Sequence, residues 1–197
     1  MKILFTSLIG LMAFAPVTPL QLGQKAPMTD HAMNDMSNRP VTLDQLKGKH
    51  GLVVIFSCNT CPFVIAWEDR YNELYEHAKK NSMGFVLINS NEAKRQGDDS
   101  MEQMVAHAKE KGYADFPYLV DAGHKLADAF GATKTPDVFV FNGKMELVYK
   151  GAIDDNERDK AAVTKKYLMD AMDATHQGKV PDPATTKSVG CSIKRVS

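Results

Sequence analysis

The chain has 197 residues, of which 44% are hydrophobic and 24% are charged. This length is typical of one domain with a core of its own. The 24 basic and 24 acidic side chains cancel to a formal net charge of zero, which argues against a nucleic-acid-binding surface and a polybasic membrane surface. Three cysteines are too few for a disulfide scaffold, and their odd number means that not all of them can pair within one chain.

The first residues have the features of a secretory leader. Lys2 precedes an uncharged, mostly apolar run at 3–15, and Ala13-Phe14-Ala15 fits a small-x-small cleavage site. The run is shorter than the roughly 20 residues that a membrane-spanning helix needs. We therefore expect residues 1–20 to be a signal peptide. The mature protein would be exported to a periplasmic or extracellular compartment, where disulfides persist, and would have no stable membrane insertion after leader removal.

From residue 51 onward, strand-like and helix-like stretches alternate. The apolar run Leu52–Phe56 predicts a strand covered on both faces, and the three-and-four spacing of apolar residues from Phe63 to Ala78 predicts a helix. The later predicted elements are, in order, a strand at 85–88, a helix at 101–108, a strand at 118–120, a short helix at 126–130, a hairpin of 138–141 and 147–149 joined through Asn142-Gly143, and a helix at 163–172.

This order predicts the fold class and the domain limits. A parallel beginning and an antiparallel end indicate an α/β protein with a mixed central β-sheet flanked by helices on both faces. We expect one domain at 21–180, followed by a C-terminal tail at 181–197 that begins with two prolines, Pro181 and Pro183.

A pair of cysteines stands between the first predicted strand and its helix, as Cys58-Asn59-Thr60-Cys61. Two thiols at this spacing can close a local disulfide, and the unpaired N–H groups at a helix N-terminus favour a thiolate. A zinc site would need a second cysteine pair or a histidine pair, and the sequence has neither. The motif therefore predicts two catalytic, redox-active cysteines and no metal or other cofactor.

The sequence resembles the thioredoxin-like superfamily, in its redoxin or peroxiredoxin-like (AhpC/TSA-type) branch. The residues that carry the resemblance are Gly23–Pro27, Phe56–Val64, Thr135-Pro136, Gly151–Asn156 and Gly190–Lys194. It implies a thioredoxin-like fold with a cis peptide bond before Pro136, beside the cysteines. It also implies that the backbone of Thr135 pairs with the bound substrate's chain and that Gly151 lets the substrate approach closely.

Pro62 leaves the identity of the attacking cysteine open. In thioredoxin-like proteins the first cysteine, here Cys58, is the exposed nucleophile and the second, Cys61, resolves. A helix that began at Cys58 would hold Pro62 in its interior, at a cost of about 3 kcal/mol, whereas a helix that began after Cys61 would hold it at the favoured first position. The Cys61-Pro62 pair also resembles the peroxidatic cysteine of peroxiredoxins. The Pro-x-x-x-Thr-x-x-Cys pattern of that family is missing, because Val54 and Cys58 stand where its proline and threonine would be.

The motif and the resemblance together predict an exported thiol–disulfide oxidoreductase. It would exchange disulfides with protein or small-thiol substrates and with an electron donor or acceptor. The alternative is a peroxiredoxin-like thiol peroxidase, an antioxidant enzyme with Cys61 as its peroxidatic cysteine. A third interpretation is a copper-binding module in which His124 joins the two cysteines.

A few further residues carry expectations of their own. Cys191, in the tail, is a candidate accessory thiol. Trp67 lies on the apolar stripe of the helix that follows the motif and is expected in the core. Asp154 and Asp155 precede the last predicted helix and are expected to cap it.

Overall fold

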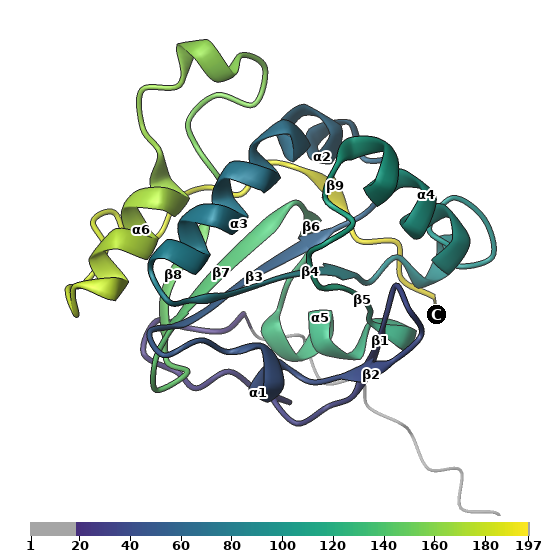
Figure 1. The fold of residues 1–197 in the computed structure, drawn as a ribbon, viewed down its shortest axis with the longest axis horizontal. Coiled ribbons are helices and arrows are strands. Elements are labelled where there is room, and N and C mark those ends of the chain that lie inside the picture. Colours follow the sequence, from purple (N-terminus) through teal and green to yellow (C-terminus); the bar gives the residue numbers. More distant parts are fainter. Residues whose placement is uncertain (1–18, 197) are drawn as a thin grey trace, which may run out of the picture.

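The computed structural model describes residues 19–196, so that most of the predicted leader lies outside it. The chain forms a seven-stranded mixed sheet in the order β2-β1-β5-β4-β3-β7-β8 (Figure 1). The three central strands are parallel to one another, and the strands on either side of them run antiparallel. The sheet strands are β1 (Met33–Asp35), β2 (Pro40–Val41), β3 (Gly51–Ser57), β4 (Gly84–Asn89), β5 (Tyr118–Val120), β7 (Asp137–Asn142) and β8 (Leu147–Gly151).

Helices cover both faces of the sheet (Figure 1). The helices α2 (Pro62–Trp67), α3 (Tyr71–Lys80), α4 (Met101–Lys111) and α6 (Tyr167–His176) pack on one face, and α1 (Leu43–Leu46) and α5 (Lys125–Phe130) pack on the other. Successive residues of β3 serve opposite faces, with Val53 and Ile55 in one core and Val54 and Phe56 in the other. The expected mixed sheet with helices on both faces is confirmed.

The helix predicted from Phe63 to Ala78 is interrupted. A turn of 3₁₀ helix, η1 (Glu68–Arg70), separates α2 from α3. The carbonyl of Ala66 accepts a hydrogen bond from the guanidinium of Arg70 at this point. A side chain thus uses an acceptor that a continuous helix would give to the backbone, which accounts for the break. Trp67, at the end of α2, is buried in the core as predicted.

The last helix begins four residues later than predicted, at Tyr167 instead of Val163. The Asp155 carboxylate accepts hydrogen bonds from the backbone N–H groups of Thr164 and Lys165, which holds this segment outside the helix. Asp155 therefore fixes the approach to α6 and does not cap it, which corrects that expectation. Gly178, just after the helix, has the left-handed conformation expected of a helix-terminating glycine.

The residues beyond 180 run back across the molecule and add a second, two-stranded sheet. In it, β9 (Cys191–Ser192) pairs antiparallel with β6 (Lys134–Thr135), the segment just before Pro136. The remaining 3₁₀ turns are η2 (Glu92–Lys94), η3 (Ala122–His124) and η4 (Lys160–Ala162). Among the described residues, no helix has the length and apolar character needed to cross a membrane.

Candidate active site

The two motif cysteines lie at the carboxyl end of β3, where the chain turns into α2. The helix begins at Pro62, with Cys61 in extended conformation as its N-cap. Proline suits this first position because its missing N–H would have no partner inside the helix. The structure thus favours the second of the two alternatives left by the sequence, since Cys61, and not Cys58, stands at the N-terminus of the helix.

Both sulfur atoms are enclosed by the segment that leads into β7. Cys58 and Cys61 are only 2% and 4% exposed. The Cys61 thiol donates to the carbonyl of Thr135 at 3.0 Å, and Cys58 Sγ lies 3.4 Å from Thr135 Oγ1. The peptide bond between Thr135 and Pro136 is cis, as predicted. The structure therefore brings Thr135 and Pro136 together with the cysteines, from more than 70 residues away.

The surroundings of the pair separate the two pKa values. The pKa of Cys61 is lowered to about 4, first by the neighbouring Cys58 thiol and then by the thiol of Cys191 and the backbone N–H of Val64, against the opposing effect of burial. The pKa of Cys58 is raised, because its proton is held by Cys61, because it is buried, and because Asp99 places negative charge nearby. One contact works against the Cys61 anion, since the Thr135 carbonyl accepts from its neutral thiol. Several donors outweigh this single acceptor, so the site favours the anion of Cys61 over that of Cys58.

A buried polar network holds the loop between the cysteines. The carboxylate of Asp99 is fully buried and accepts from the backbone N–H of Asn59 at 2.9 Å. It also accepts from the side-chain amides of Asn89 at 2.8 Å and Asn91 at 2.9 Å. The hydroxyl of Tyr118 donates to Asn59 Oδ1 at 3.2 Å. The motif is thus fixed by a charge-assisted set of bonds that also places a negative charge near Cys58.

The third cysteine joins the other two. β9 brings Cys191 opposite Thr135, and a cavity of about 70 Å³ is lined by all three cysteines together with Thr135 and Asn91. Lys94 and Lys194 supply positive charge to the same cavity. All three cysteines are free thiols. Sequence spacing gave no reason to expect Cys191 beside the motif, because the contact depends on the path of the whole tail.

Gly151 lies at the end of β8, beneath the tail. Its backbone φ is +149°, and a Cβ built there would lie 2.0 Å from Thr186 Oγ1. The residue therefore allows a close approach between two chain segments, whereas the resemblance implies the approach of a substrate. The segment that makes the approach here is the protein's own C-terminal tail.

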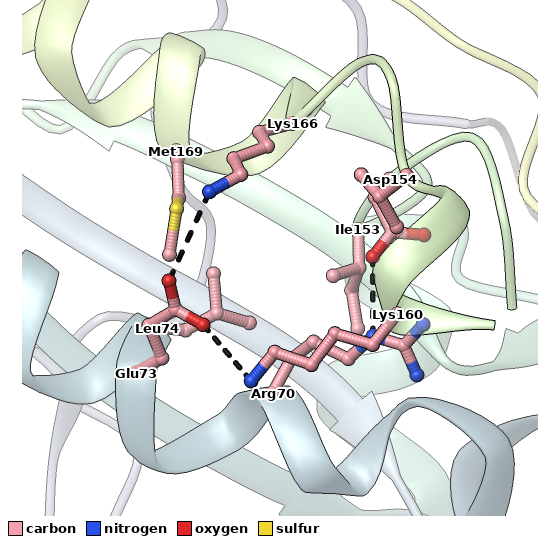
Figure 2. Close-up of a pocket in the computed structure, with 9 residues that line it drawn as sticks. Arg70, Glu73, Leu74, Ile153, Asp154, Lys160, Lys166 and Met169 are labelled. Carbon is pink, nitrogen blue, oxygen red and sulfur yellow. Dashed lines mark ion pairs between the residues drawn. The ribbon is translucent and has the colours of Figure 1, made fainter.

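Asp154 lies outside the cysteine cavity and has a structural role. It accepts from Trp67 Nε1 at 2.7 Å, and its carboxylate lies 3.3 Å from Arg70 Nε. Figure 2 shows this ion pair at one end of a second cavity, of about 110 Å³, with Glu73 between Lys160 and Lys166 at the other end. No cysteine is among the residues that line this cavity. Asp154 ties the loop before α6 to the end of α2 and so supports the helix that carries Cys61.

His124, the residue considered as a copper ligand, points elsewhere. Its Nδ1 lies 2.7 Å from Asp128 Oδ2, and it does not line the cysteine cavity. Within residues 19–196, no three or more His, Cys, Asp or Glu side chains are grouped so that they could hold a metal ion. The copper-binding interpretation therefore has no geometry to support it in the part of the chain that the structure describes.

Sequence reasoning missed the polar residues around the motif. Asn89 is the last residue of β4, Asn91 follows it closely, and Asp99 lies in the segment between η2 and α4. The carboxyl ends of parallel strands meet at one edge of a sheet, so polar residues after β4 could have been expected beside the residues that follow β3. Asp137 was also missed. It is buried next to Pro136, accepts from Ser188 Oγ at 2.6 Å, and has a pKa raised to about 6, mainly by burial.

A dithiol motif after a central parallel strand, with a cis Thr135-Pro136 peptide whose threonine contacts both sulfur atoms, is typical of a thioredoxin-like fold. Comparison with known proteins agrees with this class and narrows it. The AhpC/TSA family pattern matches residues 22–150, and the chain belongs to this family. It is accordingly an oxidoreductase of the redoxin type, as the resemblance implied.

The relatives include both a thiol-disulfide oxidoreductase and a peroxiredoxin. The chain is similar to the thiol-disulfide oxidoreductase ResA of Halalkalibacterium halodurans, with 24% identity over 68% of this chain and 70% of that protein. It is also similar to the chloroplastic peroxiredoxin Q of Sedum lineare, with 29% identity over 59% of this chain and 63% of that protein. Among solved structures, an uncharacterized conserved protein from Geobacillus kaustophilus matches at 35% identity with a TM-score of 0.81, covering 89% of this chain and 92% of that one.

Proposed function

We propose that the protein is a thiol–disulfide oxidoreductase in which Cys61 attacks and Cys58 resolves. The observation that carries this proposal is the position of Cys61, which is the N-cap of α2 and receives hydrogen-bond donors that favour its anion. The thioredoxin-like order of attack, with Cys58 first, is less well supported, because Cys58 retains the proton of the pair.

The exchange takes place in two balanced steps. The Cys61 thiolate attacks one sulfur of a substrate disulfide, a mixed disulfide forms, and the other substrate sulfur leaves as a thiolate. The charge on Cys61 is then gone, and with it the main cause of the raised pKa of Cys58. Cys58 attacks the Cys61 sulfur, the bond from Cys61 to the remaining substrate sulfur breaks, and the Cys58 proton goes to that sulfur as it leaves. The motif is then oxidised to a disulfide by two electrons, and the substrate is reduced by two. The reverse sequence oxidises a dithiol.

The substrate class and the compartment follow from separate features. A protein segment or small thiol carrying a disulfide fits a cavity that is lined by both motif cysteines and Thr135, with Lys94 and Lys194 beside them. The similarity to a thiol-disulfide oxidoreductase supports this class of substrate. The leader-like residues 1–20 support export to a periplasmic or extracellular compartment.

A thiol peroxidase is the second candidate, and two observations favour it. Cys61 is followed by Pro62 at the helix start, and peroxiredoxin Q is among the relatives. In this reaction the Cys61 thiolate would attack a peroxide oxygen, release water or an alcohol, and carry a sulfenic acid for Cys58 to resolve. At the place of the peroxiredoxin threonine stands the Cys58 thiol, a weaker hydrogen-bond donor to a peroxide than a hydroxyl.

The test uses the Cys191→Ser protein, which has the motif pair alone. In the Cys191→Ser protein, we expect the added change Cys58→Ser or Cys61→Ser to abolish the turnover of a disulfide-containing peptide. Of these two changes, only Cys61→Ser should also abolish formation of the mixed disulfide. Hydrogen peroxide consumption is measured on the same samples. Faster turnover of peroxide than of the peptide disulfide, measured as kcat/KM, would replace the first candidate by the second.

A further inference from the structure

The C-terminal tail occupies the two positions that the resemblance assigns to a bound substrate. At the first position, the backbone of Cys191 is the register partner of Thr135. At the second, Thr186 covers Gly151, its Oγ1 accepting from the backbone N–H of Ala152 at 2.9 Å. The chain therefore fills the expected substrate groove with its own residues, and a cysteine stands where the residue paired with Thr135 would be.

The fit of the tail is close on both sides of Cys191. A Cβ built on Gly190 would lie 2.3 Å from the carbonyl oxygen of Thr135, so that glycine permits the tail to lie directly on this backbone. Before it, Ser188 donates to the buried Asp137 at 2.6 Å. After it, Ile193 is buried in the core on the other face of the sheet. The tail is thus anchored at both ends of the segment that presents the thiol.

Cys61 is the common neighbour of the other two cysteines. The Cys58 and Cys191 thiols line the same cavity as Cys61, and both contribute to lowering its pKa. Burial and the nearby Cys61 raise the pKa of Cys191 to about 11, while Lys194 acts in the opposite direction. A Cys61 sulfur bound in a disulfide carries no charge, so the contribution of Cys61 disappears at that stage. Cys191 is therefore held as a thiol while Cys61 is a free thiolate and ionises more readily once Cys61 is bonded.

We propose that Cys191 is a second resolving thiol of the same chain, which can attack the Cys61 sulfur in place of Cys58. The proposal deepens the proposed function and rests on the role of Cys61 as the attacking sulfur. In the step, the Cys191 sulfur bonds to the Cys61 sulfur of a mixed disulfide, the bond from Cys61 to the substrate sulfur breaks, and the Cys191 proton goes to the substrate thiolate. If Cys58 is the leaving sulfur instead, a Cys58–Cys61 disulfide becomes a Cys61–Cys191 disulfide with no net oxidation.

The test uses the full-length Cys58→Ser protein, glutathione disulfide at neutral pH, and intact mass measurement after acid quenching. Cys61 attacks glutathione disulfide and acquires one glutathione. We expect Cys191 to displace it, so that the protein ends with a Cys61–Cys191 disulfide, identified by peptide mapping, and without an adduct. In the matched Cys58→Ser/Cys191→Ser protein, the glutathione adduct on Cys61 should persist at least tenfold longer.

Two glycine substitutions test whether the position of the Cys191 thiol matters, and not only its presence. Gly190→Ala in the Cys58→Ser protein retains the Cys61 and Cys191 thiols but forces β9 off the Thr135 carbonyl, so the adduct should persist. Gly97→Ala is the control, because a Cβ there meets nothing closer than 3.9 Å. An adduct in Cys58→Ser as long-lived as in Cys58→Ser/Cys191→Ser overturns this proposal and leaves the proposed function intact. Absence of any adduct on Cys61 in Cys58→Ser/Cys191→Ser counts against the proposed function itself.

Discussion

The ionisation of Cys61 can be measured in a protein that has no other thiol. The chain contains three cysteines, so Cys58→Ser/Cys191→Ser leaves Cys61 alone. Serine hydroxyls in place of the two neighbouring thiols still donate hydrogen bonds, and the helix still begins at Pro62. The pKa of Cys61, lowered to about 4 in the parent protein, is expected to remain well below that of a free cysteine.

The size of the effect follows from the fraction of thiolate. A free cysteine with a pKa of about 8.5 becomes roughly 75 times more ionised between pH 6 and pH 8, whereas a thiol with a pKa near 4 is fully ionised throughout this range. Absolute rates are a poor guide, because a thiolate of low pKa is also intrinsically less nucleophilic and Cys61 is nearly buried. The shape of the pH profile is the informative quantity.

The assay is alkylation by iodoacetamide, followed by mass measurement from pH 4 to pH 10. We expect the rate at Cys61 to change less than about twofold between pH 6 and pH 8. The reciprocal protein, Cys61→Ser/Cys191→Ser, leaves Cys58 alone, and its rate should keep rising above pH 8. A rise of more than about tenfold at Cys61 between pH 6 and pH 8 would refute the assignment of Cys61 as the thiolate.

Three further predictions concern buried carboxylates. In the protein that retains Cys58 alone, Asp99→Asn should speed alkylation of Cys58 severalfold at pH 8, because the nearby negative charge that raises its pKa is removed; an unchanged rate would deny that coupling. Asp154→Ala should lower the free energy of unfolding in urea by about 3 kcal/mol, since it strips partners from the buried Arg70 and Trp67, whereas a loss under about 1 kcal/mol would mean that this tie is unimportant. The pKa of Asp137 is raised to about 6, against roughly 3.9 in the unfolded chain, so the folded state binds this proton more tightly. The stability that protonated Asp137 contributes is therefore full below about pH 4 and is lost as the pH rises through 6. The stability difference between the parent and Asp137→Asn should therefore shift against the parent by about 1.4 kcal/mol from pH 5 to pH 8, and an equal difference at both pH values would contradict the argument.

Elements with a strong local pattern could be predicted from the sequence. The continuous apolar run in β3 and the paired runs of β7 and β8 reflect burial on the sheet, which is a local property of the chain. β1 and the edge strand β2 were not predicted, because with three and two residues they leave little hydrophobic period to detect. The break after α2 depends on a side chain of Arg70 that bonds back to the helix, which no apolar spacing encodes.

Part of the candidate site was also predictable, because it is encoded in short local motifs. Cys58 and Cys61 are neighbours in sequence, and Thr135-Pro136 carries a recognisable resemblance. The roles of Asp99 and Cys191 depend on long-range packing, since one comes from the loop after β4 and the other from a tail that crosses the molecule before pairing with β6. Pro62 is compatible with two positions of the helix start, and only the observed backbone distinguishes them.

A redox titration of the purified protein against glutathione, with disulfides mapped by mass spectrometry at each point, tests the central claim most directly. The account predicts a reversible two-electron transition in which Cys61 takes part in every intramolecular disulfide, with Cys58 as its partner in the Cys191→Ser protein. A Cys191→Ser protein that forms no disulfide between Cys58 and Cys61 over the glutathione range, while remaining folded, would contradict it.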